Sequence, residues 1–265
     1  MYCLPKLKEF KFEGNEHFVY ENGMLMDKER KKLLKFFNID KLTSLKLPES
    51  IEETGPYSIC GVSLNEIKFG SNIHTIGGNT FFYSMNLKNI EIPDNVTYLG
   101  GNICHTCTNL TSVTFGKNVK KLDEDVFFYC PSLQSENVNM NGNEYFKIEN
   151  HCLMDKEEKI LYLHFGSDKS TQLELPKTIE KTMNYSFNYN SNLKSIELPS
   201  SLTYIGGYTF YNTPNLESIK YYGINEPQKG SDSIIVYENK LNKVYVPVNY
   251  EGDTFCGKPV EKILK

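Results

Sequence analysis

The chain has 265 residues, and its 29 lysines and arginines stand against 33 aspartates and glutamates, giving a net charge of −4. This balance argues against a nucleic-acid-binding protein, which would favour a basic stripe. No apolar run approaches the ~18 residues that a membrane-spanning helix needs, so we expect no direct membrane insertion.

The first predicted element is a short strand within residues 1–12, where Glu9, Phe10, Lys11 and Phe12 alternate between polar and apolar. Its pattern matches the end of one repeat and the strand of the next. We therefore expect a truncated first repeat. Because terminal repeats normally carry a polar cap, either the chain is a fragment of a longer protein or a partner covers this end.

Residues 13–40 interrupt the repeat and predict a β-hairpin. Leu25-Met26 lies before an Asp-Lys-Glu turn, and Lys32-Leu33-Leu34 lies after it. Residues 141–168 carry the same motif, shifted by 128 positions, since Asn15 aligns with Asn143 and Met26 with Met154. A tandem duplication explains both hairpin insertions.

Residues 41–140 contain a regular repeat, with leading leucines 23 residues apart at 64, 87, 110 and 133. The same spacing separates Leu193 from Leu216 within residues 169–222. A fixed period of this length indicates units that cannot bury their apolar faces alone and must stack. The sequence therefore predicts a solenoid.

One unit illustrates the expected local structure. Ile196 and Leu198 alternate with Glu197, which indicates a strand with one buried face. Pro199 has no N–H for the ladder and ends the strand, and Gly206-Gly207 allows a turn that a Cβ would obstruct. Phe210 is expected to fill the interior.

Residues 223–265 are predicted to contain the last repeat and a C-terminal cap. Leu241 begins a final strand, and residues 250–265 lack the second half of the motif. In all, we expect one continuous solenoid over residues 1–265, with about ten units of ~23 residues and two hairpin insertions.

The repeat resembles the BspA-like leucine-rich repeat family, most clearly from Ser84-Met85-Asn86-Leu87 to Cys130-Pro131-Ser132-Leu133. The resemblance implies a leucine-rich repeat solenoid, a β-rich right-handed coil of the β/α type. Proteins of this family include surface antigens of mucosal bacteria and protozoan parasites, which are implicated in adhesion to host cells and to matrix proteins such as fibronectin and fibrinogen.

Reactive residues do not form a recognisable catalytic pattern. Cys104 and Cys107 make a C-x-x-C motif, but the second half of a zinc site is missing, and Cys107 and Cys130 share one repeat phase. We expect small thiols stacked in the ladder. The seven cysteines show no regular pairing that would indicate a disulfide framework. The five histidines are scattered, so we expect no enzyme, cofactor or metal site.

The exposed strand positions are the candidate protein-binding face. The residues four positions after the first residue of each repeat form a polar row, basic early in the chain and acidic later, which would steer a protein ligand. A merely solvated face is the alternative. The row consists of Lys11, Lys46, Lys68, Glu91, Thr114, Glu174, Glu197 and Lys220.

We therefore expect a non-catalytic protein-binding solenoid, with adhesion to host cell or matrix proteins implied by the resemblance. A location on the cell surface, or secretion as part of a longer parent, is favoured. The alternative is a cytoplasmic scaffold or regulatory subunit that docks another protein. The absence of a signal-peptide pattern and the unpaired thiols favour this alternative. The oligomeric state stays open.

Overall fold

The structure, a computed structural model, describes residues 15–38, 40–166, 170–236 and 239–264. The chain divides into two compact units, Met1–Tyr145 and Phe146–Lys265, and each is described by itself. The expected strand in residues 1–12 lies outside the described residues. That the solenoid is single and continuous stays a prediction.

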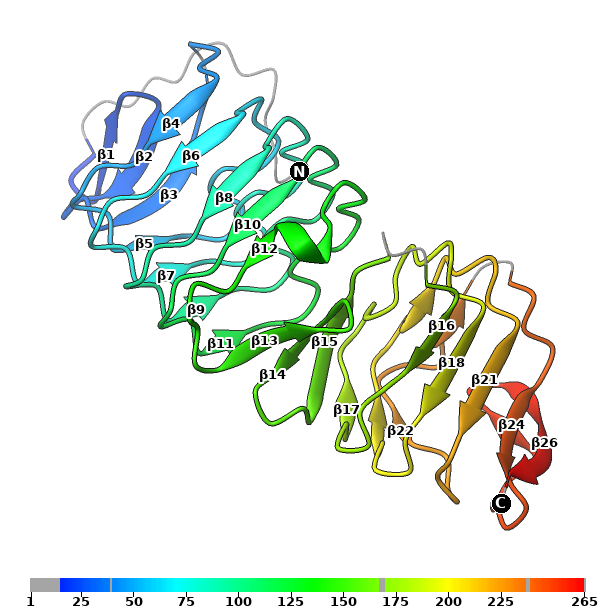
Figure 1. Cartoon of the computed structure of the whole chain (residues 1–265). Coiled ribbons are helices and arrows are strands. Elements are labelled where there is room, and N and C mark those ends of the chain that lie inside the picture. Colours follow the sequence, from blue (N-terminus) through cyan, green and yellow to red (C-terminus); the bar gives the residue numbers. More distant parts are fainter. Residues whose placement is uncertain (1–14, 39, 167–169, 237–238, 265) are drawn as a thin grey trace. The chain divides into compact units, whose positions relative to one another are not determined.

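The first unit is a coil whose short strands form two sheets (Figure 1). The seven-stranded sheet has the order β1-β2-β3-β5-β7-β9-β11, and the five-stranded sheet has the order β12-β10-β8-β6-β4. The strands are β1 Phe18–Glu21, β2 Met24–Asp27, β3 Lys32–Phe36, β4 Ser44–Lys46, β5 Glu53–Thr54, β6 Glu66–Lys68, β7 Thr75–Ile76, β8 Asn89–Glu91, β9 Tyr98–Leu99, β10 Ser112–Thr114, β11 Lys121–Leu122 and β12 Val138–Asn139.

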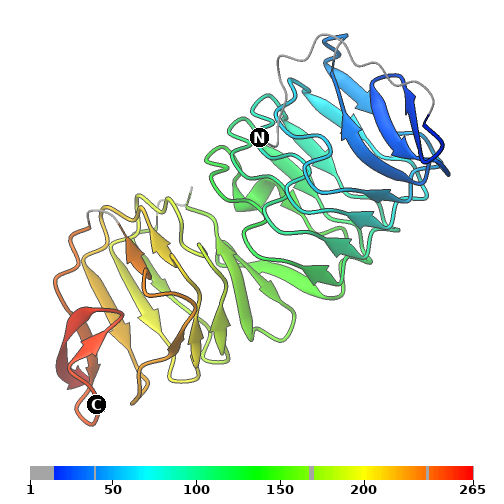
Figure 2. The same cartoon turned by 180° about the vertical axis from the view of Figure 1, so that it is seen from behind.

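The second unit repeats this plan with two six-stranded sheets and one short strand pair, seen from behind in Figure 2. The sheet orders are β13-β14-β15-β17-β19-β22 and β16-β18-β21-β24-β26-β25, and β20 pairs with β23. The strands are β13 Phe146–Glu149, β14 Cys152–Asp155, β15 Ile160–His164, β16 Gln172–Glu174, β17 Lys181–Thr182, β18 Ser195–Leu198, β19 Tyr204–Ile205, β20 Phe210–Tyr211, β21 Ser218–Tyr221, β22 Gln228–Lys229, β23 Ile235–Val236, β24 Val244–Pro247, β25 Thr254–Phe255 and β26 Lys258–Leu264.

Parallel pairing at constant register builds the core. In the first unit Leu45 lies opposite Ile67, and Ile90 lies opposite Val113. All four side chains are buried. Each contributes roughly 1.5–3 kcal/mol through burial. Among the described residues the helical content is one 3-10 turn, η1 Ser135–Asn137, so the predicted β-rich solenoid is confirmed.

Each hairpin insertion is a three-stranded antiparallel sheet. β2 and β3 form the expected pair around the Asp-Lys-Glu turn, but β1 also pairs with β2, which the sequence did not reveal. β13, β14 and β15 repeat the arrangement. The third strand of each insertion then pairs in parallel with the solenoid, β3 with β5 and β15 with β17.

The paired glycines are required by close backbone approach. A Cβ on Gly206 would lie 2.4 Å from the carbonyl carbon of Met183, and one on Gly100 would lie 2.2 Å from the nitrogen of Gly78. Such contacts are too short for a side chain to be accommodated. The left-handed backbone of this turn falls instead on the next residues, with φ of 57° at Asn79 and 55° at Asn102.

The C-terminal segment extends a sheet. β26 pairs in parallel with β24, and β25 turns back to pair antiparallel with β26. Phe255 is fully buried, and its ring lies 4.9 Å from that of Tyr221. The segment 250–264 thus adds a strand to the last parallel repeat and packs the Phe255 ring into the core.

Replacing Ile196 by Asp should unfold the second unit. Ile196 is 1 % exposed, between Leu173 and Ile219 in the parallel ladder. A buried unpaired carboxylate costs several kcal/mol, a large part of the ~5–15 kcal/mol that stabilises a typical domain. Ser195→Asp, on the other side of the same strand, is the control. Circular dichroism melts measure the stability of both variants. If Ser195→Asp is destabilised as much as Ile196→Asp, the assignment of Ile196 to the buried side of the ladder is wrong.

Replacing Asp125 by Asn should stabilise the first unit at neutral pH. Asp125 has a φ of 61° and occupies the turn position of Asn79 and Asn102 in the preceding repeats, so Asn suits this backbone. Its Oδ1 is buried and lacks a hydrogen-bond partner within the described part of the chain. Burial, and secondly the Glu124 carboxylate, raises the pKa of Asp125 to about 7.

The sign of the pH dependence follows from this raised pKa. Between its ordinary value of 3.8 and about 7, the folded state keeps a proton that the unfolded state loses, so stability falls as the pH rises. Asp125→Asn removes this loss. Its gain in free energy of unfolding over the wild type, measured by urea titration, should therefore grow from pH 4 to pH 7. A gain that does not change with pH would contradict the assignment.

Candidate functional site

The parallel ladder of the first unit aligns part of the predicted polar row. In β4 and β6, Lys46 lies directly opposite Lys68, and in β8 and β10, Glu91 lies opposite Thr114. These side chains alternate with the buried aliphatic ones, so they are directed away from the core. Lys46, Lys68 and Glu91 are exposed, and Thr114 is half-buried.

The second unit aligns the rest of the row. Glu174 of β16 lies opposite Glu197 of β18, which in turn lies opposite Lys220 of β21. The first predicted member, Lys11, lies outside the described residues. Each unit therefore carries its own short row, and the charge gradient along the whole chain stays a prediction.

Local ion pairs reduce the predicted basic character in the first unit. Lys68 Nζ lies 3.3 Å from Glu66 Oε1 on the same strand, and Lys46 Nζ lies 4.0 Å from Glu49 Oε1. Such exposed pairs contribute only ~0–1 kcal/mol each to stability. The carboxylates of these pairs still lower the local positive charge. The predicted row considers one residue per strand and therefore leaves them out.

A tyrosine that sequence reasoning missed completes the face of the second unit. Tyr222 follows β21, where the preceding repeat has Pro199, and is 38 % exposed. Its Oη donates to Glu197 Oε2 at 2.7 Å, while Lys220 Nζ lies 2.8 Å from Glu197 Oε1. The bonds from Lys220 and then Tyr222 lower the pKa of the Glu197 carboxyl. The sequence signal that could have identified Tyr222 is an aromatic residue at the repeat position that Pro199 occupies in the preceding repeat.

These residues border a shallow cavity. Its volume is about 400 Å³, and Glu174, Glu197 and Tyr222 contribute to its wall together with Lys177, Pro199 and Ser200. An exposed aromatic ring whose hydroxyl bonds to a carboxylate suits a contact with a protein ligand, because interfaces are enriched in tyrosine and arginine.

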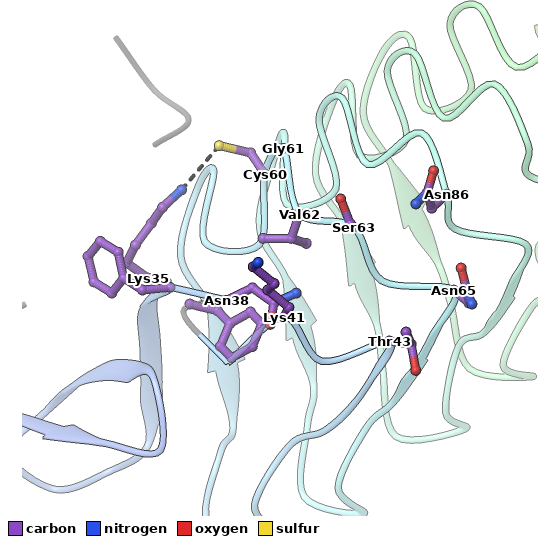
Figure 3. Close-up of a pocket in the computed structure, with 12 residues that line it drawn as sticks. Lys35, Asn38, Lys41, Thr43, Cys60, Gly61, Val62, Ser63, Asn65 and Asn86 are labelled. Carbon is purple, nitrogen blue, oxygen red and sulfur yellow. Dashed lines mark hydrogen bonds between the residues drawn. The ribbon is translucent and has the colours of Figure 1, made fainter. Parts of the chain in front are cut away.

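A second cavity lies in the first unit, beside the end of β3 (Figure 3). Its volume is about 500 Å³. Lys35 Nζ, at its wall, donates to the Tyr57 carbonyl oxygen at 2.7 Å and to Cys60 Sγ at 3.1 Å. Burial lowers the pKa of the Lys35 ammonium to about 8. Sequence reasoning did not single out this lysine.

The cysteines mostly behave as packing residues. Cys104 and Cys107 are buried, as predicted, and Cys107 Sγ donates to the Phe81 carbonyl oxygen at 3.1 Å. Burial raises the pKa of the Cys104 thiol, which disfavours a reactive thiolate. Cys60, however, is disulfide-bonded, so the expectation of unpaired thiols is wrong there.

Among residues 15–38, 40–166, 170–236 and 239–264, no three His, Cys, Asp or Glu side chains gather in a way that could hold a metal ion. No helix in this part of the chain has the length and apolar character needed to cross a membrane.

Short parallel strands, stacked with one apolar residue inward and polar residues outward, define a leucine-rich repeat solenoid. The model of the BspA type leucine rich repeat region matches residues 34–160 and 144–229, in six copies. The chain belongs to this family. No curated protein matches the sequence.

Three solved structures share the fold. A leucine-rich repeat protein from Eubacterium ventriosum is 19 % identical with a TM-score of 0.64, over 78 % of this chain and 60 % of that one. The pneumococcal vaccine antigen PcpA is 23 % identical with a TM-score of 0.59, over 78 % and 62 %. A leucine rich cell surface protein from Faecalibacterium prausnitzii is 16 % identical with a TM-score of 0.55, over 91 % and 84 %. This chain thus spans less than two thirds of the first two.

Proposed function

We propose that this chain is a non-catalytic protein-binding domain displayed at a cell surface, where it binds a protein of a host cell or its extracellular matrix. The observation that carries the proposal is the polar strand face of the second unit, with the exposed Tyr222 bonded to Glu197 beside it. In the second unit, Glu174, Glu197 and Lys220 are held in register by the ladder, so the face is ordered before a ligand arrives. Preorganisation lowers the entropy lost on binding.

The charge arrangement supports a protein as the ligand. Lys220 and Tyr222 both bond to Glu197, while Glu174 on the neighbouring strand is exposed. A tyrosine next to an exposed carboxylate offers a partner an apolar ring and a charge that can pair with arginine or lysine. Complementary charges of this kind guide encounter and fix orientation more than they add affinity.

Two observations support a non-catalytic role and a surface location. Burial raises the pKa of the neighbouring Cys104 and Cys130 thiols, which disfavours reactive thiolates, and the shifted groups Lys35 and Asp125 lie on separate turns. One structure of this fold is described as a cell surface protein and another as a vaccine antigen. These descriptions concern those proteins, and we extend the location to this chain by analogy of fold.

Antibody labelling of the source cells tests the location. Intact, unpermeabilised cells should be labelled, and a cytosolic protein labelled only after permeabilisation serves as the control. If this chain also needs permeabilisation, the surface location is wrong, and an intracellular scaffold that docks another protein becomes the better hypothesis.

Binding to immobilised fibronectin and fibrinogen tests the face. The double variant Glu174→Lys/Tyr222→Ala should weaken binding at least tenfold, because it reverses a charge and removes the exposed aromatic ring of the face. Glu157→Lys/Tyr145→Ala makes the same changes at exposed positions outside these strands and should leave affinity unchanged. If the wild-type chain binds neither fibronectin nor fibrinogen, the proposal of a matrix ligand is wrong. If both double variants lose affinity to the same extent, the proposed binding face is wrong.

A further inference from the structure

The face of the second unit holds two carboxylates directly opposite each other. Glu174 of β16 lies opposite Glu197 of β18 in the parallel ladder, where neighbouring strands are ~4.8 Å apart. Like charges at such a spacing repel each other. Lys220 of β21 relieves the repulsion only in part, because it lies on the far side of Glu197. The Glu174 end of the row therefore keeps a negative charge.

The two carboxylates differ in their partners. Glu197 uses both oxygens, since Oε1 lies 2.8 Å from Lys220 Nζ and Oε2 accepts a hydrogen bond from Tyr222 Oη at 2.7 Å. Within the described part of the chain, no hydrogen bond or ion pair engages the Glu174 carboxylate, and the residue is exposed. The site can therefore accept one further cation, at Glu174.

The first unit balances its like-charged pair with its own residues. Lys46 lies opposite Lys68 in the ladder. Lys46 Nζ lies 4.0 Å from Glu49 Oε1, and Lys68 Nζ lies 3.3 Å from Glu66 Oε1. Glu174 has no such counterion among residues 170–236 and 239–264. Local arrangements that the fold leaves unbalanced tend to mark functional sites.

Tyr222 is held in a defined position beside these carboxylates. Its backbone N–H donates to the Leu198 carbonyl oxygen at 3.1 Å, a bond that the proline of the preceding repeat cannot make. Its hydroxyl is held by Glu197, and the residue is still 38 % exposed. A partner can therefore pack on the ring without first having to order it, which lowers the entropy lost on binding.

The cavity bordered by these residues suits one long side chain. Its volume of about 400 Å³ lies near the lower end of the ~300–1,000 Å³ usual for small-molecule pockets. Leu175 and Pro199 give the wall an apolar part, which suits the aliphatic stem of a long charged side chain. Glu174 and Tyr222 add a carboxylate and an aromatic ring to the same wall.

We propose that this cavity accepts an arginine side chain of the protein partner, whose guanidinium group pairs with Glu174 and packs on the Tyr222 ring. The inference rests on the proposed function, because it names the side chain that the same face recognises. A planar guanidinium group can form two parallel hydrogen bonds to a carboxylate and can also stack on an aromatic ring. A lysine ammonium is a strongly hydrated point charge that matches these two groups less well.

The test is a nuclear magnetic resonance titration of the ¹⁵N-labelled full chain with the peptide acetyl-glycyl-arginyl-glycine amide. Two comparison peptides carry lysine, or citrulline, which has nearly the shape of arginine but no charge, in place of the arginine. We expect the arginine peptide to shift the amide signals of Glu174 and Tyr222 and to bind roughly fivefold more tightly than either comparison peptide. No binding of the arginine peptide, or equal binding of either comparison peptide, would overturn the proposal.

Substitutions at the two contact residues test the geometry. Glu174→Gln and Tyr222→Leu should each weaken binding of the arginine peptide roughly fivefold, because each removes one of the two contacts. Tyr222→Phe keeps the ring and should keep most of the affinity. Glu157→Gln, at an exposed residue outside these strands, is the control and should bind like the wild type. Wild-type affinity in both Glu174→Gln and Tyr222→Leu, or equal losses in Tyr222→Leu and Tyr222→Phe, would overturn the proposal.

Lys177 distinguishes a cationic from an anionic ligand group. It is exposed and contributes to the cavity wall, so Lys177→Ala should leave the affinity for the arginine peptide unchanged or raise it. Weaker binding in this variant would overturn the proposal, because the cavity would then favour a carboxylate.

The titrations contain no host protein, so their failure can be told apart from failure of the proposed function. If the arginine peptide does not bind while Glu174→Lys/Tyr222→Ala still weakens binding to fibronectin or fibrinogen, only the arginine site is wrong. If the peptide binds as expected but neither matrix protein does, the arginine site stands and the matrix ligand is wrong.

Discussion

The structure depends on parallel pairing of strands that are only two to four residues long in most repeats. One such strand cannot exist alone, because it buries only one or two apolar side chains and leaves its backbone groups unpaired. Stacking solves both problems together: Ile196, for example, gains apolar neighbours on both sides while its strand gains ladder partners. The exposed side chains are then placed by the same register, so surface and core are fixed by one constraint.

The sequence predicted the features that this register dictates. Leucines 23 residues apart gave the coil, and alternation within each strand identified Lys46, Glu174 and Lys220 as outward-facing residues. Features that depend on contacts between distant residues were not predictable. β1 has a weak strand pattern and forms because β2 offers it an edge, and the ion pair between Lys68 and Glu66 depends on side-chain rotamers.

The most informative residues depart from the repeat. Tyr222 replaces a proline, and Lys35 replaces the leucine of the second insertion. Neither departure is explained by the core: Tyr222 is partly exposed and bonds to Glu197, and Lys35 bonds to Tyr57 and Cys60 while its burial opposes its charge. In a repeat protein each residue can be compared with the equivalent residue of another copy, which shows what packing alone requires.

The short strand β25 has a consequence for behaviour in concentrated solution. A parallel sheet of the β16–β24 type ends in unpaired amide and carbonyl groups, onto which a second chain could add its own strand. β26 presents such an edge, and the two-residue strand β25 folds back against its first residues, Lys258 and Pro259, while Phe255 anchors the fold-back in the core. The C-terminal hairpin therefore shields the beginning of this edge from the addition of a strand by another chain.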